Sequence, residues 1–184
     1  MQKTDLSKFN NDWYKTGASF PVRAVWYLLN RAFFISYFPF SSFKIFLLRM
    51  FGAQLGKSLV IKPHVNIKYP WRLKIGDHCW IGEGVWIDNL DDVVIGNNCC
   101  LSQGALLLCG NHNYKKPSFD LMTGKIIFEE GVWIGAKAVV CGGVTCKSHA
   151  VLSVASVAVA DINAYSVYQG NPAVKIKERV ISEQ

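Results

Sequence analysis

Four histidines are the side chains of this 184-residue chain best suited to move a proton near neutral pH. A catalytic zinc site would need three of them to converge, and the spacings of His64, His78, His112 and His149 do not offer that. His112 differs because it stands where a regular repeat opens into a long irregular stretch. Such a place can form the wall of a cleft, in which a neutral imidazole takes the proton of an attacking hydroxyl.

A catalytic imidazole needs a partner that holds its second nitrogen. Asn113 follows His112 and carries no charge, so no acid is available at that position. The repeat described next places Asp92 one coil beneath His112, which makes its carboxylate one candidate partner. A backbone carbonyl is the other candidate, and the sequence is equally compatible with Asp92 as an ordinary turn residue.

The elements that must position these side chains follow a repeat of six residues, clearest between positions 75 and 95. Each unit holds an aliphatic residue, often followed by glycine, and a small residue four places on, as in Ile75-Gly76-Asp77-His78-Cys79-Trp80. A period of six fits neither an α-helix nor an alternating strand. It is typical of a β-helix, in which each hexad supplies one short strand and one corner.

The aliphatic positions form trios with six-residue steps, and extra residues enter only after a complete trio. We therefore expect an all-β fold, a parallel β-helix of about five triangular coils with insertions at one edge. The longest insertion, residues 113–127, should form an excursion loop there. The inward positions are Leu55, Ile61, Ile67, Ile75, Ile81, Ile87, Ile95, Leu101, Leu107, Phe128, Ile134, Val140, Cys146, Leu152 and Ala158.

The register also predicts which side chains share a column, because neighbouring coils lie about 4.8 Å apart. Asp88 and Asn89 fall one coil below the strand that leads to His112, where polar groups could hold the hydroxyls of a ligand. Cys79 and Cys99 occupy the same inward small position in successive coils, so both are expected to be buried thiols.

Composition is that of a globular protein, with 51% hydrophobic and 18% charged residues. The six cysteines form no CxxC pair and no metal-ligand spacing, so no metal is expected. The net charge of +7 is concentrated in residues 1–51, which hold seven Lys and Arg against two acids. Because this basic segment is also aromatic and apolar, nucleic acid is not the expected partner. No signal peptide precedes the first apolar run, which favours a cytoplasmic location.

The N-terminal region reads as two amphipathic helices broken near Pro39. They could cap the open first coil or pack on a neighbouring subunit, or residues 20–51 could lie on the inner face of a membrane. These two roles do not exclude each other. The expected regions are the helical cap (1–54), the β-helix (55–163) and a C-terminal turn followed by a short helix (164–184).

Together these segments resemble the hexapeptide-repeat acyltransferases, and within them the colanic-acid-type polysaccharide O-acetyltransferases. The hexads indicate the fold, while the histidine loop and the closing Gly-Asn-Pro-Ala make acyl transfer the expected activity. The matching pieces are LLRMFGA (47–53), IGEGVWIDNLDDVVIG (81–96), LSQGALLLCGNHNY (101–114), PSFDL (117–121), GVWIGAKAVVCGGVT (131–145) and GNPA (170–173).

The resemblance implies a left-handed β-helix, usually a homotrimer, that moves acetyl groups from acetyl-CoA to a hydroxyl or amine. It implies that His112 is the catalytic base and that the strand of Asp88 and Asn89 faces the acceptor. Tyr114 would belong to the loop that closes over a neighbouring subunit's site. Relatives often carry an acid where this chain has Asn113, which puts the group that orients the histidine in doubt.

For the donor, the resemblance implies that pantetheine lies in a groove between two prisms, held largely by backbone groups of the later coils. A backbone N–H near Gly135 or Ala136 would stabilise the oxyanion. A Thr-Lys pair that often meets CoA is replaced by Val159-Ala160, so Lys175, Lys177 or Arg179 would supply charge for the phosphates. The matching donor positions are Gly135, Ala136, Ser153, Val154 and Ala155.

The expected function is therefore acetylation of a sugar hydroxyl during surface or exopolysaccharide biosynthesis, on a lipid-linked or nucleotide-linked intermediate. One alternative is an acetyltransferase for a small free sugar or serine. Another is a non-catalytic β-helix that acts as a scaffold or binds sugar, and the departures at Asn113 and Val159-Ala160 are its best support.

Overall fold

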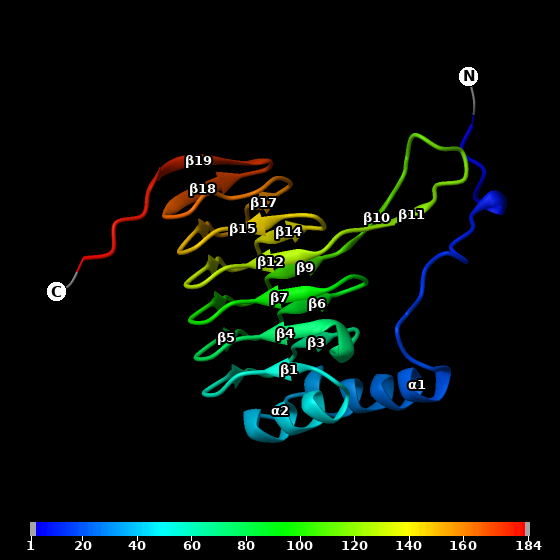
Figure 1. The fold of residues 1–184 in the computed structure, drawn as a ribbon, viewed down its shortest axis with the longest axis horizontal. Helices are drawn as coiled ribbons and strands as arrows, with labels where there is room; N and C mark the ends of the chain where they lie inside the picture. Colours follow the sequence, from blue (N-terminus) through cyan, green and yellow to red (C-terminus); the bar gives the residue numbers. More distant parts are fainter. Residues whose placement is uncertain (1–2, 183–184) are drawn as a thin grey trace.

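Three parallel β-sheets form the sides of a solenoid in the computed structural model, which describes residues 3–182 (Figure 1). The first sheet contains β1 (Gln54–Leu55), β4 (Leu73–Ile75), β7 (Val93–Ile95), β12 (Ile126–Phe128) and β15 (Thr145–Cys146). The second contains β2 (Val60–Ile61), β5 (Trp80–Ile81), β8 (Cys100–Leu101), β13 (Trp133–Ile134), β16 (Val151–Leu152), β18 (Ser166–Gly170) and β19 (Ala173–Glu178). The third contains β3 (Asn66–Ile67), β6 (Trp86–Asp88), β9 (Leu106–Leu108), β14 (Val139–Cys141) and β17 (Val157–Ala158).

The predicted hexad register is confirmed, because aliphatic residues of equal rank pair in neighbouring coils. Leu55 pairs with Ile75 in the first sheet, and Ile81 pairs with Leu101 in the second. The number of coils is nearer six than the predicted five, since Ile162 bridges to Cys146 and Tyr168 pairs with Leu152. The step from Ala158 to Ile162 is four residues and not six, which hid this last coil from the periodicity.

The prism interior is apolar and includes the two expected thiols. Cys79 and Cys99 are each 1% exposed, and their Sγ atoms lie 3.0 Å from the Gly96 oxygen and 3.1 Å from the Glu129 oxygen, respectively. Burial removes thiols from solvent, so these cysteines act as small core residues.

The N-terminal helices close the first-coil end of the prism, as the cap interpretation predicts. They are α1 (Phe20–Leu29), a π-helical turn (Asn30–Phe34) and α2 (Ser41–Met50), with Pro39 in the break. Leu48 is fully buried, and the Ser41 hydroxyl bonds both the N–H and the carbonyl of Ile61. The cap therefore satisfies edge groups of the first coil that would otherwise face solvent.

The excursion is a hairpin of β10 (Gly110–His112) and β11 (Leu121–Thr123) that projects from the prism (Figure 1). Its predicted bounds, 113–127, are shifted, because Ile126 pairs with Val93 and already belongs to the next coil. Two short 3-10 turns, Leu6–Lys8 and Pro70–Arg72, complete the regular structure.

The predicted C-terminal helix is wrong. Residues Ala173–Glu178 form β19, which runs antiparallel to β18 after the expected tight turn at Asn171-Pro172. The physical reason is the alternation of Val174 and Ile176 with lysines, a two-residue period that favours a strand over a helix. In the described part of the chain, no helix has the length and hydrophobicity needed to cross a membrane.

Candidate active site

His112 lies at the end of β10, where the hairpin leaves the prism. Its Nδ1 atom is 2.9 Å from the carbonyl oxygen of Phe119. Its ring stacks on the Phe119 ring with 4.5 Å between the ring centroids and 7° between the ring planes. The Phe9 ring approaches from the N-terminal segment at 5.9 Å. Because a carbonyl only accepts, Nδ1 must carry the proton, which leaves the lone pair on Nε2. A neutral imidazole in this tautomer has the form of a general base.

Asp92 does not serve as the partner of His112. Its carboxylate lies 3.6 Å from the Lys125 ammonium, and its carbonyl accepts from Ile126 in the next coil. In the next coil, the position stacked on Asp92 is therefore filled by residues that follow the hairpin. His112 does not occupy it, because the chain leaves the prism at Gly110, where β10 begins. Of the two candidate partners predicted for His112, Asp92 and a backbone carbonyl, the structure shows the second, the carbonyl of Phe119.

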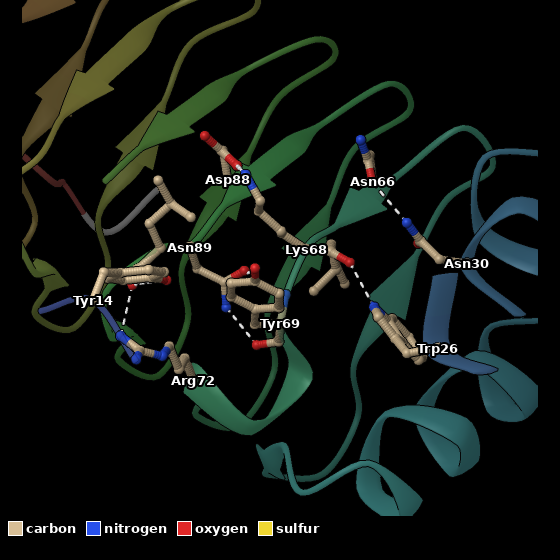
Figure 2. Close-up of polar contacts among 11 residues, drawn as sticks. Tyr14, Trp26, Asn30, Asn66, Lys68, Tyr69, Arg72, Asp88 and Asn89 are labelled. Atoms are coloured by element: carbon tan, nitrogen blue, oxygen red, sulfur yellow. Dashed lines mark hydrogen bonds and ion pairs between the residues drawn. The ribbon is translucent and has the colours of Figure 1, made fainter. Parts of the chain in front are cut away.

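The two predicted acceptor residues of β6 and its corner have different surroundings. Asn89 is fully buried, and its amide brackets the backbone of Tyr69 with bonds of 2.9 Å and 2.6 Å, so it is not available to a ligand (Figure 2). Asp88 lies 2.8 Å from the Lys68 ammonium and borders a cavity beneath α1. Tyr114 is 75% exposed at the tip of the hairpin.

A cavity of about 880 Å³ runs along the second sheet and ends at the C-terminal strand. Four of the five predicted donor residues line it: Gly135, Ala136, Ser153 and Val154. Ala155 adjoins the lining through Val154. Lys175 is not part of the lining, but its ammonium pairs at 2.5 Å with Glu178, which borders the cavity together with Lys177 and Arg179. We call this cavity the donor groove.

The wall of the donor groove offers a free backbone donor. The Gly135 N–H is occupied, because it donates to the Leu152 carbonyl at 2.7 Å. Among residues 3–182, no hydrogen-bond acceptor lies on the N–H of Ala136. Of the two amides considered for an oxyanion, Ala136 is therefore the one that can still donate.

Several residues of the site carry no signal in the hexad pattern. Arg179 fixes the C-terminal tail beside the groove, since its Nη1 donates to the carbonyls of Gly131 and His149 at 2.9 and 3.0 Å. Trp133, 47% exposed, forms the opposite wall, and its Nε1 donates to the Ser102 hydroxyl at 2.9 Å. The sequence named Arg179 only as a possible phosphate ligand, and its bonds to two backbone carbonyls are what the repeat could not predict.

The sequence did not predict that residues 3–19, here called the N-terminal strap, pack against the prism and the hairpin. The strap climbs from α1 to the hairpin along one side of the prism (Figure 1). Tyr14 donates to the Leu90 carbonyl at 2.7 Å, and the Asp5 N–H donates to the Pro117 carbonyl at 2.8 Å. Arg72 also bonds the Leu90 carbonyl, so the strap and the prism share an acceptor (Figure 2). The strap has no periodicity, and only its aromatic residues hinted at packing.

His112 and the donor groove belong to different sides of the same prism, the histidine beyond the third sheet and the groove along the second. The arrangement supplies a histidine with a fixed ring, a backbone amide that can donate and a long groove with small residues in its wall. Within residues 3–182, no three His, Cys, Asp or Glu side chains are grouped to hold a metal ion. His64 and His149 instead bond the carbonyls of Ile35 and Glu130 through Nδ1.

Comparison with known proteins identifies the family. No protein-family model matches the chain. The chain is 34% identical over 180 residues to a protein of Escherichia coli K12 with the provisional name colanic acid biosynthesis acetyltransferase WcaF, with 97% of this chain and 99% of that protein aligned.

Among solved structures, a hexapeptide-repeat acetyltransferase of Vibrio cholerae complexed with acetyl coenzyme A superimposes with a TM-score of 0.79 at 22% identity, covering 90% and 92% of the two chains. A galactoside acetyltransferase in complex with coenzyme A superimposes with a TM-score of 0.76 at 21% identity, covering 86% and 80%. The chain therefore belongs to the hexapeptide-repeat acyltransferases, in the group of the colanic-acid-type acetyltransferases.

Proposed function

We propose that this protein transfers the acetyl group of acetyl-CoA to a hydroxyl of a sugar during surface polysaccharide assembly, with His112 as general base. The observation that carries the proposal is the His112 tautomer. The Phe119 carbonyl holds the proton on Nδ1 at 2.9 Å, so Nε2 is free to accept the proton of an acceptor hydroxyl.

The reaction is a direct attack. The hydroxyl oxygen bonds to the thioester carbon as Nε2 of His112 takes its proton, and the carbonyl becomes an oxyanion that the Ala136 N–H stabilises. The carbon–sulfur bond then breaks, and the imidazolium returns the proton to the departing CoA thiolate. No acyl-enzyme is needed.

Acetyl-CoA is assigned to the donor groove. Its volume of about 880 Å³ and the small residues Gly135, Ala136 and Ser153 suit an extended thioester chain. Lys177, which borders the groove, is the candidate to hold CoA phosphate in place of the absent Thr-Lys pair. Arg179 is committed to two backbone carbonyls and acts mainly in shaping the tail.

The proposed assembly is a homotrimer, and the separation of the two half-sites supports a site shared between copies. The base and the donor groove lie on different sides of one prism, so a complete site requires His112 of one copy to meet the groove of another. The exposed Tyr114 of the hairpin tip would then contact the second copy. An isolated protomer is expected to have no transferase activity.

The location proposed is the cytoplasm, with contact to the inner face of the membrane through the helical cap. The outer face of the cap bears large apolar side chains that no described residue covers, among them Phe20 (73% exposed), Leu28 (66%) and Met50 (65%). Arg49 is also exposed in the cap, which suits anionic lipid. Sedimentation with anionic and neutral vesicles tests this contact, and Phe20→Ser with Leu28→Ser should reduce it.

The function is tested by thiol release from acetyl-CoA across a panel of sugar acceptors. His112→Asn should reduce acceptor-dependent release at least about a hundredfold while acetyl-CoA binding is retained. His78→Asn is the matched control, because His78 is an exposed turn residue with a left-handed φ of 57° that asparagine tolerates. Equal release by both variants would exclude His112 as the base.

The panel also separates the alternatives. Release with free monosaccharides or serine alone would favour a small-acceptor enzyme. Failure of the wild-type protein to bind acetyl-CoA would favour a non-catalytic scaffold, the reading supported by Asn113 and by Val159-Ala160.

A further inference from the structure

A second cavity of about 360 Å³ lies beneath α1, against the third sheet. The helical cap supplies one wall and the strands β3 and β6 the other. Its volume is within the range of small-molecule sites. We call it the cap cavity; it is lined by Arg23, Trp26, Tyr27, Asn30, Arg31, Ile35, Asn66, Lys68, Tyr69, Trp71, Trp86 and Asp88.

The cap cavity gathers polar atoms that lack hydrogen bonds. Among residues 3–182, three buried side-chain polar atoms make no hydrogen bond: Arg23 Nε, Asn30 Oδ1 and Asp88 Oδ1, of which Asp88 Oδ1 is ion-paired with the Lys68 ammonium at 2.8 Å. All three belong to residues of this one lining. Asn30 and Asp88 are only 6% and 8% exposed. Unsatisfied buried polar groups are costly, and their convergence on one cavity indicates a ligand that completes them.

The nature of these atoms constrains the ligand. Asn30 uses its amide nitrogen on Asn66 at 2.7 Å, so its free oxygen requires a donor such as a sugar hydroxyl (Figure 2). Asp88 Oδ1 is already ion-paired with the Lys68 ammonium at 2.8 Å, and its second lone pair can accept from a hydroxyl. The free Nε of Arg23 requires an acceptor.

The charges of the lining favour an anion. Lys68 and Asp88 neutralise each other, whereas Arg23 and Arg31 have no carboxylate within 4.0 Å in the described part of the chain. The lining therefore carries an excess of two positive charges. Guanidinium groups hold phosphate through paired, directional hydrogen bonds.

Two exposed aromatic side chains border the cap cavity and could contact a sugar ring. Trp86 is 45% exposed and Tyr27 is 60% exposed at the border of the cap cavity. Aromatic rings beside hydrogen-bonding groups give a surface on which the apolar face of a sugar ring can pack. Asp88 also pairs with Leu108 in β9, which leads into the hairpin that carries His112. The cap cavity thus lies on the side of the prism from which the base projects.

We propose that the cap cavity binds a sugar that carries a phosphate or diphosphate at its anomeric carbon. Arg23 and Arg31 hold the phosphate, Asn30 and Asp88 accept from sugar hydroxyls, and Trp86 packs on the ring. This inference rests on the proposed function, because it makes the acceptor a glycosyl phosphate and not a free sugar.

Titration calorimetry without acetyl-CoA tests the binding itself. The probes are a nucleoside diphosphate sugar, a farnesyl diphosphate sugar, the unphosphorylated methyl glycoside and inorganic pyrophosphate. The inference predicts that at least one glycosyl diphosphate binds at least about tenfold more tightly than the methyl glycoside and than pyrophosphate. Tighter binding of the nucleoside diphosphate sugar would identify a nucleotide carrier, and tighter binding of the farnesyl diphosphate sugar would identify a lipid carrier.

Arg23→Gln and Arg31→Gln should each weaken that probe about tenfold, with unchanged melting temperature and acetyl-CoA affinity. Lys74→Gln is the matched control, since Lys74 is an exposed cation of β4 outside the cavity. Equal affinity for the methyl glycoside, equal affinity for pyrophosphate, or unchanged binding by both arginine variants would overturn the inference. Arginine-dependent binding without acetylation of the bound sugar would leave this site standing and refute the proposed function.

Discussion

The Nδ1 atom of His112 lies 2.9 Å from the carbonyl oxygen of Phe119, while the two rings stack at 4.5 Å. Both residues belong to one hairpin, so the excursion orients its own histidine. A backbone carbonyl fixes the tautomer as well as a carboxylate would, although it does not stabilise the imidazolium by charge. The Phe119 carbonyl thus orients the ring of His112 in a chain that has Asn113, and not an acid, after its histidine.

The stack on Phe119 should matter for rate more than for binding. Phe119→Ala keeps the backbone carbonyl but removes the ring that holds the imidazole plane. We expect kcat to fall roughly ten- to a hundredfold, because small losses of alignment are costly, with little change in the KM for acetyl-CoA. Steady-state kinetics measures both. Met122→Ala, at a half-exposed position of the same hairpin, should leave kcat unchanged. A wild-type kcat in Phe119→Ala would rule out this positioning role.

The N-terminal strap should contribute measurably to stability through Tyr14. Burial raises the pKa of Tyr14 to about 12, and its hydroxyl donates to the Leu90 carbonyl at 2.7 Å. Tyr14→Phe removes one hydrogen bond and should cost about 1 kcal/mol of unfolding free energy. Urea unfolding detects this change. Tyr37→Phe, whose hydroxyl lies on an 82% exposed side chain, is the control and should cost nothing measurable.

The prism was predictable because its rule is local and repeated. Every coil needs an aliphatic residue at each side, so the fifteen inward positions fixed the three sheets and their register. The prediction failed where that rule ends. The four-residue step to Ile162 concealed the last coil, and the alternation around Ile176 was read as a helix although its period is two.

Which residues line the large groove was mostly predictable, and the surroundings of His112 were not. Gly135, Ala136, Ser153 and Val154 sit on the repeat, so a resemblance transfers to them position by position. The partner of His112 depends on how the hairpin folds back, which no periodicity describes. The prediction that Asp92 lies beneath His112 assumed that the chain stays on the prism through residue 112, whereas it leaves the prism at Gly110.

The ammonium of Lys44 should make the cap less stable at neutral pH than at alkaline pH. Lys44 is fully buried with one hydrogen bond, to the Lys62 carbonyl at 2.8 Å, and burial lowers its pKa from 10.5 to about 8. Between these values the unfolded chain holds a proton that the folded chain has lost. Stability therefore rises with pH across that window, and the full penalty applies below pH 8.

Lys44→Met should accordingly be more stable than the wild type at pH 7, and the difference should shrink towards pH 10.5. Thermal unfolding of both proteins at several pH values measures this. Lys74→Met, at an exposed position, should show no such convergence. A Lys44→Met variant that is less stable at pH 7 would mean that the bond to Lys62 outweighs desolvation.

Gly135 should be the least replaceable residue of the donor groove. A Cβ atom there would lie 2.6 Å from the Val154 nitrogen and 2.8 Å from the Leu152 oxygen, both backbone atoms of the next coil. Coils bonded in a parallel ladder cannot separate locally, so Gly135→Ala should cost about 3 kcal/mol, at the upper end for overpacking, and lower the melting temperature by several degrees.

Gly104→Ala is the informative comparison. Gly104 has a φ of +68°, but an added Cβ would meet only the Lys137 side chain, at 3.5 Å. The cost should be that of the left-handed backbone alone, about 1 kcal/mol. Acetyl-CoA affinity should fall in Gly135→Ala and not in Gly104→Ala, because only the first change displaces the strand that exposes the Ala136 amide. If both variants lose stability equally and bind acetyl-CoA alike, the close packing of coils at Gly135 does not shape the groove.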